Sequence, residues 1–216
     1  MPNLASRPEP PRGERESSGP AQRCPDLALP WALRREACGS QNGSKIGEFE
    51  LGVAVSLEEF KAAMTRRASA ISIVTSRAGD VVHGMTVSDF AGVSLDPPLV
   101  LVCADKSSIT TGVIERGRCF AINILSSDQE ALSNRFASKQ DEHRRFEDLA
   151  VQTGLTGAPL VPGSVASMDC ELVATHDAGD HVIYVGRVVK TVVRELEPLV
   201  HYHGCYARLA APDARA

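Results

Sequence analysis

The sequence predicts a mainly β protein, a closed or split antiparallel β-barrel with a few flanking helices. Three observations lead to this class. Strand-like runs of irregular spacing fill residues 70–202, helical patterns interrupt them only briefly, and no G-x-G-x-x-G follows a strand, which argues against a Rossmann domain. With 216 residues, 43% of them hydrophobic, the chain can bury one ordinary core.

The N-terminal segment, residues 1–52, differs in composition from the rest. It is rich in Pro, Arg, Glu, Ser and Gly and lacks apolar periodicity, so it cannot bury enough surface to offset chain entropy. We expect a disordered or linker-like extension there, in which Trp31–Ala37 could form a short helix. The folded domain is expected over residues 53–210, followed by a tail at 211–216.

A helix is predicted at the start of this domain. Ser56 and Glu59 form an S-x-x-E capping box, and the helix should run to about Arg67 with Leu57, Phe60 and Met64 on one face. Two further helices are expected at Ser108–Arg116 and at Asp128–Ala137, the latter capped by Ser126 or Ser127.

Strands should account for most of the remaining domain. Ala70–Ser76 and Val81–Val87 are expected to form a hairpin around Ala78-Gly79-Asp80. The other predicted strands are Leu99–Ala104, Cys119–Leu125, Val165–Thr175, His181–Val193 and Leu199–Tyr202.

Several classes of function are excluded by composition. Apolar runs such as Leu99–Ala104 have strand length and fall far short of the ~20 residues that a membrane-spanning helix needs. The N-terminus has no apolar signal-peptide core, so we expect a cytoplasmic protein. Six cysteines without C-x-x-C pairs predict reduced side chains and no metal site. A net charge of -4 argues against a nucleic-acid partner, because phosphate binding needs a basic surface.

The most informative segment reads HGMTVSDF over His83–Phe90 and then VSLDPPLVLV over Val93–Val102. A hydroxyl-bearing strand follows a glycine, and two prolines predict an extended crossing into the next strand. Small polar side chains and free backbone N–H groups at a barrel rim suit a planar ligand. Thr86 and Ser88 could equally be ordinary strand residues with locally bonded hydroxyls.

A second candidate site lies in Asp105–Thr111, between a strand and a helix. The start of a helix has unpaired N–H groups and a partial positive charge, so with Lys106 and several hydroxyls it predicts an anion site. The alternative, compatible with this, is that Ser107 or Ser108 only caps the helix.

The chain resembles the short-chain flavin reductases, which are the reductase components of two-component flavin monooxygenases. The resemblance covers about Leu57–Leu209 and implies a split antiparallel Greek-key β-barrel of the FMN-binding type. Its specificity comes from the order and spacing of short motifs: Gly84–Ser88, Ser94–Leu99, Lys106–Ser108, Asn123–Leu125, Asn134–Ala137 and Gly179–His181.

The resemblance also implies roles for single residues. Thr86, Val87 and Ser88 would lie along the isoalloxazine edge, and Ser94 would border the flavin. The phosphate would meet Lys106, Ser107 and Ser108, with Asp105 beside them as a further cofactor-binding residue. Arg135 and Phe136 would approach from the last helix. Asp89 departs from the family, which usually has serine there. An acidic group near the ring would disfavour the anionic reduced flavin, so we expect Asp89 to point away.

Nicotinamide binding is associated in this family with the motif Gly179-Asp180-His181. His181 follows a Gly-Asp turn, which would hold its imidazole at a rim where it can reach a ligand. We therefore assign Asp180 and His181 to this role. Weaker candidates, for each of which a structural role is the alternative, are His83, His201, His203 and Tyr206.

The predicted activity is NAD(P)H-dependent reduction of FMN or FAD by hydride transfer, in a homodimer that supplies a partner oxygenase. The flavin carries this chemistry, so no catalytic side chain and no metal are required. Two alternatives remain on the same barrel: a flavin-binding protein without turnover and a flavin-dependent oxidase of a small amine. The Gly179–His181 motif favours the reductase. The oxidase would want a second basic cluster for a substrate phosphate.

Overall fold

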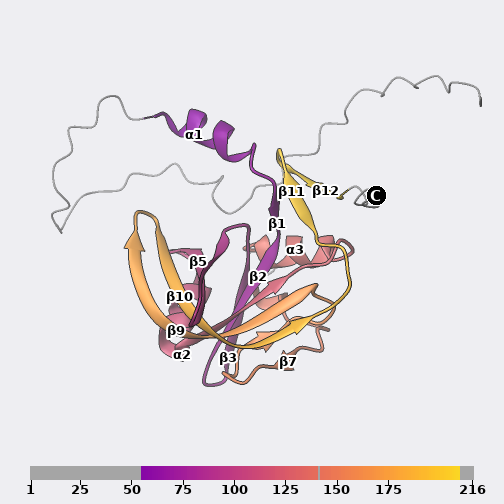
Figure 1. The fold of residues 1–216 in the computed structure, drawn as a ribbon. Helices are drawn as coiled ribbons and strands as arrows, with labels where there is room; N and C mark the ends of the chain where they lie inside the picture. The colour runs from indigo at the N-terminus through magenta and orange to yellow at the C-terminus, as the bar shows by residue number, and fades with distance from the viewer. Residues whose placement is uncertain (1–54, 141, 210–216) are drawn as a thin grey trace, which may run out of the picture.

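The computed structural model describes residues 55–140 and 142–209. Within these ranges the chain is mainly β, with antiparallel strands and three α-helices, which confirms the predicted class (Figure 1). A seven-stranded sheet in the order β3-β2-β6-β9-β10-β5-β4 forms the body of the protein. Its strands are β2 (Ser72–Ala78), β3 (Val81–Val87), β4 (Phe90–Leu95), β5 (Pro98–Asp105), β6 (Cys119–Ile124), β9 (Ala166–Ala178) and β10 (His181–Val193).

Two small sheets complete the strand content of the described residues. In the first, the order is β1-β11-β12. These strands are β1 (Ser69–Ala70), β11 (Val200–Tyr202) and β12 (Cys205–Ala207). The second pairs β7 (Gln152–Thr153) with β8 (Pro159–Leu160). The sequence pattern predicted β11 but not β7, β8 or β12, because two- and three-residue strands carry no readable alternation.

The helices are α1 (Leu57–Met64), α2 (Ile109–Gly117) and α3 (Glu130–Ala137), with a short 3-10 turn, η1 (Glu142–Arg144). The predicted capping box of α1 is confirmed, since Glu59 and Ser56 exchange backbone and side-chain bonds. Helix α1 ends at Met64 rather than near Arg67. For α3 the predicted serine cap is wrong: the helix begins after Gln129, whose Oε1 accepts from the Ser126 N–H at 3.1 Å, and the Ser126 hydroxyl bonds Asp128 instead.

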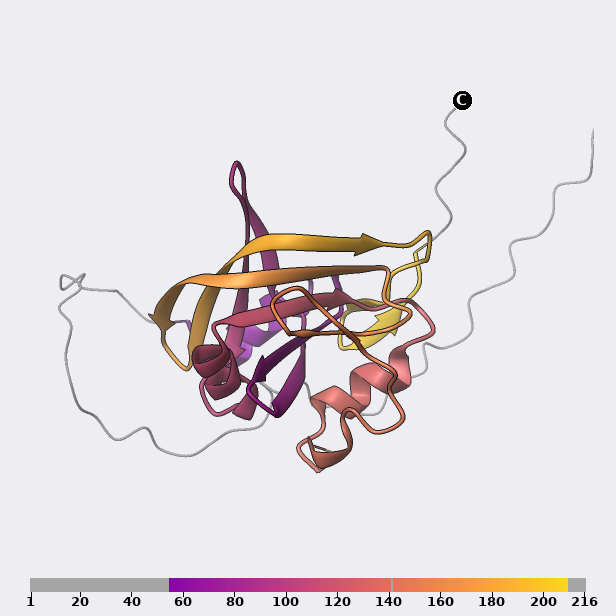
Figure 2. The same cartoon turned by 90° about the horizontal axis from the view of Figure 1, so that it is seen from below.

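The segment around the two prolines is a hairpin, where an extended crossing into the next strand was expected. Strand β4 turns at Asp96 and the cis-bonded Pro97 and pairs back along β5, so that Leu95 faces Pro98. Proline is tolerated here because Pro97 lies in the turn and Pro98 is the first residue of β5, before the pairing with β10 begins at Leu99. This hairpin projects beyond the rest of the sheet (Figure 2), and the Leu95 side chain at its tip is 97% exposed.

The hydrophobic core occupies the concave side of the sheet in two main clusters. The larger one includes Phe120, Tyr184 and Val102, and the smaller one joins Ile71, Phe136 and other apolar residues beneath α3. Among the described residues, no helix is long and apolar enough to cross a membrane. The four cysteines of the described ranges are free thiols, and no group of metal-ligating side chains is found there.

A candidate flavin-binding cavity

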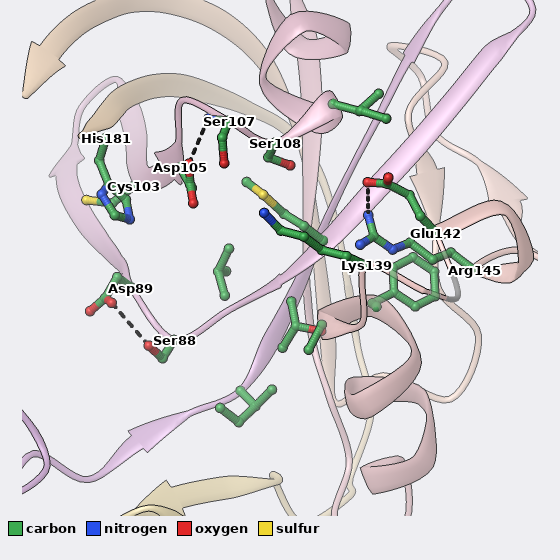
Figure 3. Close-up of a pocket in the computed structure, with 17 residues that line it drawn as sticks. Ser88, Asp89, Cys103, Asp105, Ser107, Ser108, Lys139, Glu142, Arg145 and His181 are labelled. Carbon is green, nitrogen blue, oxygen red and sulfur yellow. Dashed lines mark hydrogen bonds and ion pairs between the residues drawn. The ribbon is translucent and has the colours of Figure 1, made fainter. Parts of the chain in front are cut away.

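A cavity opens between the end of β3, the end of β5, the start of α2 and the C-terminal end of α3 (Figure 3). Its walls are partly apolar, as a flat aromatic ligand requires. The apolar lining residues are Ile71, Met85, Val87, Ile109, Phe136 and Ala137. The polar ones are Thr86, Ser88, Asp89, Cys103, Asp105, Ser107, Ser108, Lys139, Glu142, Arg145 and His181.

The Thr86–Ser88 segment lines this cavity at the end of β3. The buried Thr86 hydroxyl donates to the backbone oxygen of Ser133 at 2.7 Å, and the Ser88 hydroxyl donates to the Asp89 carboxylate at 3.1 Å. Both hydroxyl protons therefore form local hydrogen bonds, as expected if Thr86 and Ser88 are ordinary strand residues. The oxygens can still accept a hydrogen bond from a ligand.

The start of α2 forms another wall. Ser108 is its N-cap and accepts a bond from the Thr110 N–H at 3.2 Å, while the Ser107 N–H donates to the Asp105 carboxylate at 2.6 Å. No acidic residue stands in the first turn of α2. This helix end therefore keeps its partial positive charge facing the cavity.

A buried charge cluster, which the sequence did not reveal, forms the inner end of the cavity. The Arg145 side chain is 4% exposed and donates to the backbone oxygens of Gly84 at 2.8 Å and Ser138 at 2.9 Å. It also contacts Glu142 at 3.2 Å, and Glu142 lies 3.5 Å from His83 Nε2. The only sequence signal was the i,i+3 spacing of Glu142 and Arg145, which is common on any surface turn.

His83 also belongs to this cluster. Its Nδ1 lies 2.7 Å from the Thr110 hydroxyl. Burial lowers the pKa of His83, the nearby Arg145 lowers it further, and Glu142 partly offsets the effect. His83 thus links β3 to α2. This is a structural role, which was the alternative to nicotinamide binding for this residue.

Lys139 is a second residue that sequence reasoning missed. It follows α3, is exposed, and extends into the cavity in Figure 3. Among the described residues no ion-pair partner of its ammonium is found. Its ammonium is thus unpaired within the described ranges, on the wall that faces the start of α2.

His181 begins β10 and reaches the same cavity from the opposite wall. Its Nδ1 donates to the Asp180 carboxylate at 2.7 Å, and this bond lowers the pKa of Asp180. Nε2 is then the ring nitrogen left for a ligand. Asp180 itself lies outside the cavity and lines a neighbouring groove.

That groove lies between α1, the end of β5 and the start of β10. It shares Ser88, Asp89, Cys103 and His181 with the cavity, so the two are continuous. At their junction Asp89 forms an ion pair with Arg67, whose guanidinium also bonds the Ser88 backbone oxygen. Asp89 thus lies at the edge of the cavity, and its direction relative to the flavin ring stays a prediction.

Three predicted residues are not brought to the cavity. Ser94 lies on the edge strand β4, Lys106 bonds the β9–β10 turn, and the Arg135 guanidinium donates to the Glu147 backbone oxygen at 3.0 Å. Of the weaker candidates, His201 lines the groove and Tyr206 bonds Ser133 and Asn134 in the described structure. The flavin and nicotinamide roles of all these residues stay predictions.

The fold has close counterparts among solved structures of flavin reductases. Flavin reductase PheA2 in its native state superposes with a TM-score of 0.66 at 32% identity, covering 73% of this chain and all of the other. The Streptomyces globisporus NADH:FAD oxidoreductase SgcE6, solved with NAD and FAD fragments, gives 0.68 at 28% identity and covers 76% of this chain and all of the other. The fold and cavity thus define a split-barrel protein of the flavin reductase type.

Residues 64–210 match the model of the flavin reductase like domain, and the chain belongs to that family. Among curated relatives, the NADH-dependent FMN reductase SmoA of Agrobacterium fabrum is 39% identical over 151 residues, which cover 70% of this chain and 85% of the relative. The reductase subunit HsaB of a flavin-dependent monooxygenase from Rhodococcus jostii is 34% identical and covers 74% and 81%. The family predicted from the ordered motifs is confirmed.

Proposed function

We propose that this protein is an NADH-dependent flavin reductase that transfers hydride from the nicotinamide to FMN or FAD. The observation that carries the proposal is a cavity with apolar walls and a helix start on one side, into which His181 reaches from the other side. Its relatives named as NADH-dependent FMN or flavin reductases support the same activity.

The residues of the cavity fit a flavin. Met85, Val87 and Phe136 offer apolar surface to the ring, and the backbone of Thr86–Ser88 offers polar groups along its edge. The start of α2, with Ser107 and Ser108, faces Lys139 across the cavity and suits the phosphate. We therefore assign the phosphate cation to Lys139 and keep Lys106 out of this site.

The groove beside α1 suits the reduced nicotinamide nucleotide, because it opens into the cavity at His181. A bound flavin accepts the hydride, so the protein has to hold two rings in contact and exclude other geometries. Nε2 of His181 can bond the carboxamide or a phosphate of the donor, while Asp180 fixes the imidazole. Arg67 balances the charge of Asp89 at the junction of cavity and groove, so that Asp89 would oppose a negative charge on a reduced flavin less.

The reduced flavin would serve a partner oxygenase in the cytoplasm, as for relatives named as monooxygenase reductase components. We also propose a homodimer. Apolar side chains on α1 and on the projecting β4–β5 hairpin are exposed in the single chain, among them Leu57, Phe60, Val93 and Leu95. Light scattering at micromolar concentration should give twice the chain mass, and a monomer would contradict the dimer.

A direct experiment separates the reductase from its two alternatives. The purified protein is loaded with FMN or FAD, and the flavin absorbance is followed while NADH or NADPH is added without oxygen. Bleaching by substoichiometric NADH is expected. Flavin that binds but stays oxidised would indicate the storage protein, and reduction by small amines alone would indicate the oxidase.

His181→Ala should raise the NADH KM with a smaller loss of kcat, and leave the flavin Kd nearly intact. His181→Asn is the matched control, because it keeps a side-chain donor and acceptor. Unaltered NADH kinetics in a folded, flavin-loaded His181→Ala protein would remove this residue from the donor site.

A further inference from the structure

The β9–β10 turn carries the Gly179–His181 motif at the end of two 13-residue strands. Gly179 adopts a φ of 64°, which a residue with a side chain rarely does. His181 is the first paired residue after the turn, opposite Asp105 of β5 on one side and Ala178 of β9 on the other. The direction of the imidazole therefore depends on how the turn is held.

Lys106, the residue after β5, contacts this turn at three points. Its backbone N–H donates to the Asp180 oxygen at 3.1 Å, and its ammonium donates to the Gly179 oxygen at 2.7 Å. The ammonium also forms an ion pair with Asp177. One residue thus bonds two successive backbone oxygens of the turn and the Asp177 side chain of β9.

The three contacts of Lys106 differ in how strongly they hold the turn. Asp177 is 80% exposed, so its ion pair with Lys106 contributes little. The bonds to the backbone oxygens act directly on the geometry of the turn, and a charged donor makes such a bond stronger than a neutral one. The loss of the ammonium would free the Gly179 oxygen and leave Lys106 bonded to the turn by its backbone N–H alone.

We propose that Lys106 is a positioning residue, which fixes the Gly179–Asp180 turn so that His181 presents Nε2 to the cavity. The proposal builds on the nicotinamide role of His181 given above. The segment Asp105–Ser108 would then serve both ligands. Lys106 would hold the turn beside the nicotinamide donor, and Ser107 and Ser108 would form the start of α2 beside the flavin.

The test compares Lys106→Met, which removes the charged N–H donors but keeps an apolar stem, with Lys106→Arg, which keeps a positive charge and N–H donors. In the FMN-loaded protein, Lys106→Met should raise the NADH KM by about 5- to 10-fold, the scale of one charge-assisted bond, with little change in kcat or FMN Kd. Lys106→Arg should restore most of the NADH KM, and Asp177→Asn should change it little.

A second measurement does not depend on the activity. The 15N signals of the His181 imidazole, recorded without ligands, report its tautomer and its bond to Asp180. They should shift in Lys106→Met and return toward their wild-type positions in Lys106→Arg.

The outcomes distinguish a failure of the positioning role of Lys106 from a failure of the proposed reductase activity. Unchanged imidazole signals together with an unchanged NADH KM in Lys106→Met would overturn the positioning role. A weaker FMN Kd with unchanged NADH KM would also overturn it and would make Lys106 a phosphate ligand. Shifted signals in a protein that never oxidises NADH would keep the positioning role and reject the reductase.

Discussion

Asp89 illustrates, at the level of a single residue, how an unexpected charge is accommodated. Its carboxylate lies at the junction of cavity and groove, where a negative charge alone would oppose the anionic reduced flavin. Arg67, just after α1, pairs with it and makes the pair nearly neutral. The same charges act on the neighbouring Cys103, whose pKa is raised by burial first and by Asp89 second.

Lys139 should contribute to flavin binding through the phosphate. Lys139→Met is expected to weaken FMN binding by about 3- to 10-fold, the loss of one charge-assisted bond at a solvent-exposed site. Fluorescence quenching of FMN measures it. Lys190→Met is the control, because Lys190 is an exposed lysine on β10 outside the cavity. Equal FMN affinity in both variants would remove Lys139 from the phosphate site.

His83 should make the stability of the fold depend on pH. The pKa of His83 is lowered in the folded chain, mainly by burial. When the pH falls below the ordinary histidine pKa of 6.5, the unfolded chain therefore binds a proton at His83 more readily than the folded chain does. The contribution of His83 to the free energy of unfolding should therefore be complete above pH 6.5. It should be lost progressively as the pH drops below that value.

Urea unfolding at pH 8 and pH 5.5 measures this effect. His83→Gln should lose less stability between the two pH values than the wild type does. His201, whose pKa is also lowered by burial, adds a background of the same sign in both proteins. An identical pH dependence in the two proteins would show that His83 does not gain a proton on unfolding.

At the level of elements, α2 connects the cavity to the back of the sheet, and its two glycines differ sharply. A Cβ on Gly117 would lie 1.9 Å from the Arg77 backbone oxygen. A Cβ on Gly112 would meet only the end of the Arg116 side chain, at 3.2 Å. The C-terminal end of α2 thus packs directly against the backbone of β2.

This difference predicts opposite effects of the same substitution. Gly117→Ala should lower the free energy of unfolding by about 2 kcal/mol or more, because backbone atoms must move apart. Gly112→Ala should raise it by about 0.5 kcal/mol, because alanine favours the helix and the arginine can turn aside. Denaturant midpoints of the two variants provide the measurement, and equal midpoints would contradict the packing of α2.

For the whole molecule, the limits of the domain predict which part of the chain is sufficient for flavin binding and NADH oxidation. A chain starting at Gly52 should bind FMN and oxidise NADH as the full chain does, since the matched family domain covers residues 64–210. Steady-state kinetics of the two proteins measure this. Intact flavin binding with lost NADH turnover in the shorter protein would assign a catalytic role to residues before Gly52.

The sequence by itself determined the local structure and the family. Strands β3 and β10 begin and end at the predicted residues, because alternating β-branched side chains and Gly-containing turns are short-range signals. The cap of α2 at Ser108 and the capping box of α1 were predictable for the same reason. The ordered motifs then indicated the family, which the match over residues 64–210 confirms.

Only the tertiary structure decided which charged side chains meet at the cavity. Lys139, Glu142 and Arg145 carry no motif. They reach the cavity because α3 packs against β3, η1 packs against α3, and Arg145 bonds the Gly84 oxygen of β3. Lys106 has a motif, yet its side chain turns to the β9–β10 hairpin, 73 residues away along the chain. A long polar side chain can bond in several directions, and only the packing of distant segments determines which partner lies within reach.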